Sequence, residues 1–192
     1  MGKILCFIYP EMADFEVTLL LHRLRKLGRK EIISVAVNKE PLMSQAGLVY
    51  VPHMTLAEAL TMDQTDVEAL ILPGGPIQEQ PPGLTELIQQ LDHQQKLLAA
   101  ICFAPQFLGR AGILDQHQFT TSCSEKHIQD LGVPDPYPRH RFVKKRVVVD
   151  GHVITAEGRA FVDFAYEVCD WLGIFESPEQ KQQMLQDNKG DS

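Results

Sequence analysis

The chain has 192 residues, of which 44% are hydrophobic and 22% are charged. This composition is typical of a globular protein, and the length suits one domain with a substantial core. Lys and Arg number 18 and Asp and Glu number 25, which gives a net charge of −7. An acidic chain of this kind is not expected to bind nucleic acid or an anionic membrane surface.

The chain begins MGKILCFIYPEMADFE, a short apolar run followed by acids. That run is too short for a secretory signal, and no stretch of the sequence approaches membrane-spanning length. We therefore expect a cytoplasmic protein. Its four cysteines, Cys6, Cys102, Cys123 and Cys169, are far apart and form no CxxC pair. In a reducing compartment they are expected to be free thiols.

Apolar runs of strand length alternate with helical patterns along the chain. Strands are predicted at residues 3–9, 32–38, 48–54, 66–75, 96–102 and 118–122. Helices are predicted at residues 13–28, 55–60, 83–95, 104–112, 158–173 and 177–186. Asp150-Gly151 stands between two β-branched runs and predicts a hairpin over residues 146–155.

This alternation is typical of βαβ units, in which helices cover both faces of a mainly parallel sheet. No internal repeat, low-complexity segment or linker divides the sequence. We therefore expect a single α/β domain over residues 1–175, followed by a C-terminal helix and a frayed tail over residues 176–192. The proline-rich segment 132–141 is expected to be a surface loop.

The segment AICFAP (100–105) places a cysteine between a predicted strand and a predicted helix. Such a sharp turn, a nucleophile elbow, needs small residues two before and two after the nucleophile, and Ala100 and Ala104 supply them. Pro105 suits the first turn of a helix. Because Cys102 would stand at the positive end of the helix dipole, we expect a lowered thiol pKa. The alternative is an inert core cysteine, and this segment alone does not decide between the two.

The segment LPGG (72–75) follows another predicted strand, at the sheet edge where ligands bind in open α/β folds. Gly74 and Gly75 leave backbone N–H groups open to close approach, as an oxyanion hole requires. Pro-Gly-Gly is also an ordinary turn, so the pattern alone is a weak signal.

Glu16 lies in the first turn of the helix predicted at 13–28, on or beside its core-facing stripe. Glu11 and Asp14 are better placed to be solvated. A carboxylate at the edge of a core is either paired or has a raised pKa. The alternative for Glu16 is a simple helix-start acid favoured by the dipole.

The combination of AAICFAP, LPGG and DFE at the start of the first helix resembles the ThiJ/PfpI family of the class I glutamine amidotransferase-like superfamily. The resemblance extends over nearly the whole chain. It implies a flavodoxin-like three-layer α/β/α sandwich that is usually dimeric. Activities known in the family include glyoxalase or deglycase action on reactive carbonyls, proteolysis, chaperoning and oxidative-stress sensing.

By position, the resemblance also implies the roles of the site residues. Cys102 matches the elbow cysteine of the family, and Glu16 matches the acid that hydrogen-bonds its sulfur. Gly75 matches a residue that offers its backbone N–H to the site, with the N–H of Phe103 as its partner.

The sequence departs from the family pattern at several positions. Protease-like members have His directly after the cysteine, where this chain has Phe103, and the late His-x-Glu pair of amidotransferases is absent. In the Parkinson-associated branch, a His follows the Thr-Thr of the next strand. Here Ser122 stands at that position, followed by Cys123 and, one helical turn on, His127. A proton shuttle would therefore depend on Glu16 or on His127.

These features favour a cofactor-free cysteine enzyme acting on a small reactive carbonyl or related electrophile, with Cys102 as nucleophile. The alternative is an oxidative-stress sensor or chaperone that uses the same cysteine with little turnover, in which Cys123 could act as a resolving thiol. A peptidase is the least favoured function, because no base adjoins Cys102.

The remaining motifs add weaker expectations. Arg159 is a possible contact for an anionic substrate, or else a surface arginine. The seven histidines are scattered without metal-ligand spacing, and no phosphate-binding glycine motif occurs, so neither a metal nor a cofactor is expected. The expected partners are a small-molecule substrate and a second copy of the chain.

Overall fold

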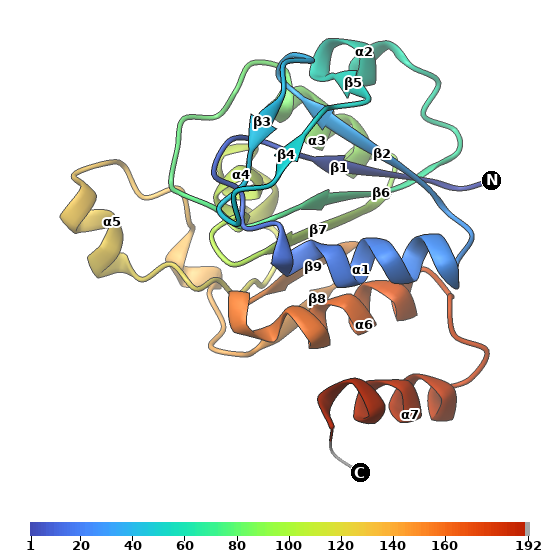
Figure 1. Ribbon diagram of the computed structural model, residues 1–192. Coiled ribbons are helices and arrows are strands. Elements are labelled where there is room, and N and C mark those ends of the chain that lie inside the picture. The colour runs from blue at the N-terminus through green and yellow to red at the C-terminus, as the bar shows by residue number, and fades with distance from the viewer. Residues whose placement is uncertain (191–192) are drawn as a thin grey trace.

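The computed structural model describes residues 1–190, in which strands and helices alternate (Figure 1). The strands are β1 (Lys3–Phe7), β2 (Glu31–Ala36), β3 (Leu42–Met43), β4 (Val49–Tyr50), β5 (Met54–Thr55), β6 (Val67–Leu72), β7 (Leu97–Ile101), β8 (Val147–Asp150) and β9 (Val153–Ala156). The α-helices are α1 (Phe15–Lys26), α2 (Leu56–Thr61), α3 (Leu84–His93), α4 (Pro105–Arg110), α5 (Glu125–Leu131), α6 (Phe161–Trp171) and α7 (Pro178–Lys189).

Seven strands form one sheet in the order β5-β2-β1-β6-β7-β9-β8. Every neighbouring pair is parallel except β8 and β9, which form the predicted antiparallel hairpin with Gly151 at φ 62° in its turn. Strands β3 and β4 form a separate two-stranded sheet. The mainly parallel α/β fold expected from the sequence is confirmed.

Helices cover both faces of the sheet (Figure 1). Helices α1 and α6 pack side by side on one face, and α7 packs against the outside of α6. Helices α2, α3 and α4 pack along the opposite face. In this arrangement the carboxyl ends of β1, β6, β7 and β9 meet at one edge, so the loops that follow these strands come together.

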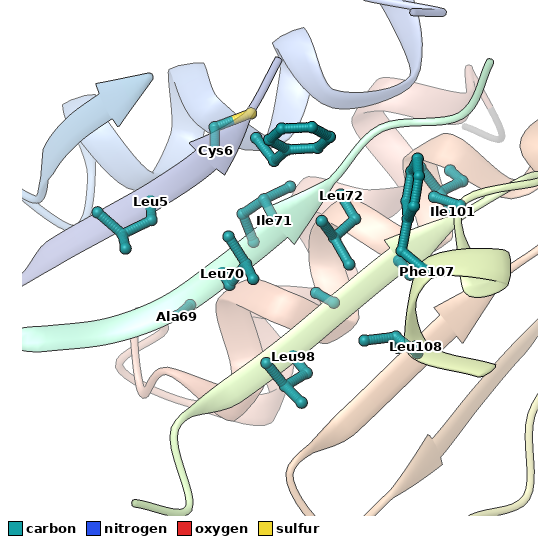
Figure 2. Close-up of a cluster of buried hydrophobic side chains, with 14 of the residues drawn as sticks. Leu5, Cys6, Ala69, Leu70, Ile71, Leu72, Leu98, Ile101, Phe107 and Leu108 are labelled. Atoms are coloured by element: carbon teal, nitrogen blue, oxygen red, sulfur yellow. The ribbon is translucent and has the colours of Figure 1, made fainter. Parts of the chain in front are cut away.

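The core lies on the central strands β1, β6 and β7 and continues under α4 (Figure 2). Every residue of β7 is buried, as expected for a parallel strand covered on both faces. Phe107 of α4 contacts the rings of Phe7 and Tyr9 edge-to-face, with centroids 5.7 and 5.5 Å away. Helix α4 is thereby fixed against β1, which places the turn between β7 and α4 beside the end of the first strand.

The prediction of one strand at residues 48–54 was wrong. This segment is divided between β4 and β5, which belong to different sheets. Pro52 stands between them and has no N–H to donate to a ladder, so a continuous strand is disfavoured there.

The region between α4 and β8 also differs from the prediction. Residues 118–122 form no strand beyond a single bridge between Phe119 and Phe142. The short helix α5 follows, and the sequence analysis did not predict it. Ser124 caps this helix by accepting a hydrogen bond from the His127 N–H, 3.1 Å away.

The last helix is longer than expected. The sequence predicted a helix to residue 186 and a frayed tail, whereas α7 continues to Lys189. The Asn188 side chain donates a hydrogen bond to Tyr166 Oη, 2.7 Å away, so contact with α6 extends the helix. The expected fraying of residues 191–192 lies outside the described residues. Within residues 1–190, no helix has the length and apolar character needed to span a membrane.

Candidate active site

Cys102 occupies a strained turn between β7 and α4. Its φ is 63°, in the left-handed region, which typically costs a non-glycine residue about 1–3 kcal/mol. Its N–H donates to Ala156 O at 2.8 Å, and its carbonyl accepts hydrogen bonds from Thr121 Oγ1 and the Ser122 N–H at 2.6 and 3.1 Å. The surrounding backbone therefore holds this conformation, and the half-buried side chain is presented as the elbow pattern predicts.

The small residues beside Cys102 explain how the turn fits. Ala100 and Ala104 are both fully buried, and Pro105 is the first residue of α4. Larger side chains at the two alanines would collide with the packed sheet and helix. The local sequence thus supports a nucleophile elbow at the carboxyl end of β7.

Glu16 of α1 reaches the same edge and hydrogen-bonds the Cys102 thiol. Only 3% of Glu16 is exposed, and its Oε2 accepts a hydrogen bond from the Gly74 N–H at 3.0 Å. Burial on the core-facing side of α1 confirms the sequence prediction. Gly74 is required at this point because a Cβ there would lie 2.6 Å from Cys102 Cβ.

Ser122 completes the hydrogen bonding around the sulfur. Its side chain hydrogen-bonds the Cys102 thiol, while its Oγ accepts the Gly158 N–H at 2.9 Å. With the serine oxygen occupied as an acceptor, its O–H is free to donate to the sulfur.

Gly158 is a site residue that the sequence analysis missed. A Cβ at this position would lie 3.0 Å from Cys102 Sγ and 2.5 Å from Glu16 Oε1. Only glycine therefore leaves the thiol and the carboxylate in contact. The available signal was a glycine two residues after the strand that ends at Ala156, at the same sheet edge as Cys102.

Two backbone N–H groups belong to the predicted oxyanion hole. The Phe103 N–H hydrogen-bonds the Cys102 sulfur, and the Gly75 N–H has no hydrogen-bond partner among residues 1–190. A side chain at Gly75 would meet Tyr9 Oη at 2.6 Å, so glycine is needed for the chain to pass the Tyr9 ring. Tyr9 is itself held by donating to Pro73 O at 2.8 Å.

The direction of the Cys102 pKa shift contradicts the sequence prediction. Burial and the neighbouring Glu16 charge raise the pKa of the Cys102 thiol to about 12. Burial also raises the pKa of Glu16, against the hydrogen bonds from Cys102 and Gly74 that lower it. The dipole of the six-residue helix α4 is too weak to outweigh desolvation. A thiolate therefore requires Glu16 to hold the proton.

Cys123 does not face this site. It is 2% exposed and contacts Tyr137 and Arg139, whereas the preceding Ser122 faces Cys102. Tyr137 Oη donates to Phe103 O at 2.9 Å, so Tyr137, which contacts Cys123, helps to hold the backbone next to Cys102.

His127 and Arg159 lie at the rim. The His127 ring packs against the Phe103 ring with centroids 5.2 Å apart. The Arg159 side chain is 73% exposed and pairs with Glu157 at 2.7 Å. Cys102, Glu16, Gly74 and Ser122 thus form one hydrogen-bonded group. His127 and Arg159 take no part in its hydrogen bonds.

The expectation that Asp14 is solvated was wrong. Only 3% of Asp14 is exposed, because Ser44 and Tyr50 from the β3–β4 region cover it. Both hydroxyls donate to Asp14 Oδ2, at 2.8 and 2.9 Å respectively.

The fold and this site agree with a comparison to known families: residues 2–170 match the DJ-1/PfpI family. The chain belongs to the DJ-1/PfpI family. This membership confirms the resemblance drawn from the sequence.

Individual DJ-1/PfpI proteins are similar at low identity. "Uncharacterized protease YoaZ" of Bacillus subtilis is 28% identical over 188 residues, covering 90% of this chain and 84% of that protein. "Deglycase PfpI" of Pyrococcus furiosus is 26% identical over 158 residues, covering 80% of this chain and 89% of that protein. The crystal structure of a thiJ/pfpI family protein from Bacillus anthracis is 26% identical with a TM-score of 0.85, covering 100% of this chain and 92% of that one.

Proposed function

We propose that this protein is a cofactor-free, cysteine-dependent enzyme that acts on a small reactive carbonyl, in the manner of a glyoxalase or deglycase. The observation that carries the proposal is the hydrogen-bonded pair of Cys102 and Glu16, one held in a strained turn and the other buried. Strain and a buried carboxylate both reduce stability, and such features gather at sites that use them. A relative named a deglycase agrees with this class of substrate.

In the first step, Cys102 Sγ attacks the carbonyl carbon and its proton passes to the Glu16 carboxylate. A sulfur–carbon bond forms, and the carbonyl π electrons move to oxygen. The N–H groups of Gly75 and Phe103 stabilise the resulting oxyanion. Glu16 then returns the proton to that oxygen, which gives a hemithioacetal and restores the carboxylate.

With a 1,2-dicarbonyl such as methylglyoxal, Glu16 acts a second time. Its carboxylate removes the proton from the sulfur-bearing carbon, which gives an enediolate, and returns that proton to the adjacent carbon. The hydroxyl proton moves from the first oxygen to the second, so the hemithioacetal becomes a thioester. Water hydrolyses the thioester to a 2-hydroxy acid and releases the Cys102 thiol. One carboxylate suffices for these transfers, in keeping with the absence of a histidine after Cys102.

The test is turnover of methylglyoxal by the wild type, Cys102→Ser and Cys123→Ser. We expect Cys102→Ser to abolish turnover and Cys123→Ser, the matched control, to retain it. Unchanged activity in Cys102→Ser would refute the proposal. Oxidation of Cys102 by mild peroxide, in a protein that turns over no carbonyl, would favour the alternative of a stress sensor or chaperone.

Thiol titration tests the proton sharing on which the mechanism depends. Alkylation of Cys102 followed against pH should report a thiol pKa of about 12 in the wild type. In Glu16→Gln the pKa should fall, because the negative charge beside the sulfur is removed. A wild-type pKa near that of free cysteine would contradict this assignment.

We also propose that the active form is a homodimer in the cytoplasm. Exposed apolar side chains on α1, in β4 and directly after β4 support a second copy as partner: Phe15, Val49 and Val51 are 54%, 61% and 66% exposed. Sedimentation equilibrium of the wild type and Val51→Asp measures this directly. A monomeric wild type at micromolar concentration would refute it.

A further inference from the structure

Three potential metal ligands meet at the end of the sheet opposite to Cys102. They are Asp92 in the last turn of α3, His117 in the loop after α4, and His152 in the turn before β9. One ligand atom from each residue lies within 4.8 Å of the other two. They are far apart in the sequence, which is why no metal-ligand spacing was visible there.

The position of this cluster separates it from the candidate active site. Leu98, near the start of β7, donates its N–H to His152 O at 2.8 Å, whereas Cys102 follows the end of the same strand. At about 3.3 Å per residue, the five residues of β7 place the two sites roughly 16 Å apart. The cluster therefore does not contribute to the chemistry at Cys102.

The side chains are held in a partly preformed arrangement. His152 is 7% exposed, and its Nε2 lies 2.7 Å from Asp92 Oδ1. The His117 ring contacts the His152 ring edge-to-face at 5.2 Å. His117 Nδ1 is buried without a hydrogen-bond partner. A buried ring nitrogen without a partner is unfavourable, and loading the cluster with an ion would reorganise the hydrogen bonding around it.

The local charge favours a cation. Asp150 adds a second carboxylate, with its Oδ2 3.7 Å from His117 Nδ1. Among residues 1–190, neither Asp92 nor Asp150 pairs with a lysine or arginine. Two carboxylates beside two imidazoles present a net negative site, which a divalent cation would neutralise.

We propose that Asp92, His117 and His152 bind a zinc ion, with water in the fourth position. Imidazole nitrogen and carboxylate oxygen are ordinary zinc ligands, and three of them are enough to hold the ion in a tetrahedral site. Asp150 orients the His117 ring from outside the coordination shell. The ion would join α3, the loop at His117 and the β8–β9 turn, so its role is to stabilise this end of the sheet.

The experiment measures zinc binding to metal-free protein by calorimetry. The protein carries Cys102→Ala, which removes the half-buried thiol as a second potential zinc ligand. We expect one zinc ion per chain and loss of measurable binding in His117→Ala. His93→Ala, which removes an exposed histidine next to Asp92, is the matched control and should bind like its parent. Asp150→Asn should bind about 10- to 100-fold more weakly.

Two further measurements make the result independent of whether each variant folds well. Cobalt(II) in place of zinc should give the visible absorption of a four-coordinate site in the parent and in His93→Ala but not in His117→Ala. Zinc at about 100 times its dissociation constant should raise the melting temperature by about 5–10 °C in the parent and leave that of His117→Ala unchanged. Absence of binding in the parent, or equal binding in His117→Ala, would overturn the proposal and leave Asp92 and His152 as a hydrogen-bonded pair.

Discussion

Two carboxylates at the start of α1, Asp14 and Glu16, are equally buried and differ in their partners. Each is 3% exposed. Asp14 accepts hydrogen bonds from Ser44 and Tyr50, and also from the Phe15 N–H at 3.2 Å. Glu16 accepts one from the Gly74 N–H and shares another with the Cys102 thiol.

Under the proposed mechanism, the donors around a buried acid, rather than its burial, decide whether it is structural or reactive. Asp14 is surrounded by hydroxyl and backbone N–H donors that take no part in the proposed reaction, and burial and the Asp14 carboxylate raise the pKa of Tyr50 to about 12. The result is a fixed link between α1 and the β3–β4 region. Glu16 faces the Cys102 thiol, the nucleophile of the proposed mechanism, so in that mechanism the same burial leaves the carboxylate placed to accept the thiol proton.

Among the variants that test this comparison, Glu16→Gln has the largest expected effect. Because glutamine cannot accept the thiol proton, methylglyoxal turnover should fall by about 10²- to 10⁴-fold. The matched control is Asp14→Asn, which should change turnover by less than about threefold when the folded protein is assayed. Equal losses in both variants would mean that the two acids play the same role.

Gly158→Ala should have the next largest effect on activity. The added methyl would press on both Cys102 Sγ and Glu16 Oε1, and a displacement of about 1 Å can reduce a rate about 10²-fold. Gly112→Ala is the control, because it also replaces a glycine but meets no atom within 4 Å, at φ 80°. Gly112→Ala should lose stability only. If Gly158→Ala keeps wild-type kcat/KM, the close packing at the thiol does not matter for chemistry.

Asp14→Ala should lower the stability of the protein rather than its catalytic activity. It leaves the Ser44 and Tyr50 hydroxyls without their acceptor, so we expect a loss of about 1–3 kcal/mol in the free energy of unfolding. Urea denaturation measures this, with Asp14→Asn expected to recover part of the loss. A stability equal to that of the wild type would show that these hydrogen bonds contribute nothing.

The smallest effect concerns the pH dependence of stability. Burial raises the pKa of Glu16 in the folded protein above its usual 4.5, so the folded state binds more protons than the unfolded state between those two values. The contribution of Glu16 is then fully favourable below pH 4.5 and is lost as pH rises through the folded-state pKa. Glu16→Gln should therefore be more stable than the wild type at neutral pH. Denaturation curves at pH 4 and pH 7 would contradict this if the difference between the two proteins were independent of pH.

The sequence by itself determined the α/β class and the place of the sharp turn at Cys102. Both are local patterns: apolar periods that switch between strand and helix, and small residues spaced around Cys102. The burial of Glu16 could also be predicted, because helical spacing placed it on the buried side of α1. The short helix α5 escaped prediction because its seven residues carry little apolar period, and Ser124 was the main signal for it.

Tertiary structure alone decided what surrounds these residues. Asp14 is buried because the β3–β4 region folds over it, and Gly158 belongs to the site because β9 ends beside β7. The thiol pKa rises because desolvation and the Glu16 charge exceed the effect of a short helix. Asp92, His117 and His152 meet only when β9 pairs with β7 beneath α3. Local sequence fixes backbone preferences, whereas desolvation and contacts between distant segments depend on how the whole chain packs.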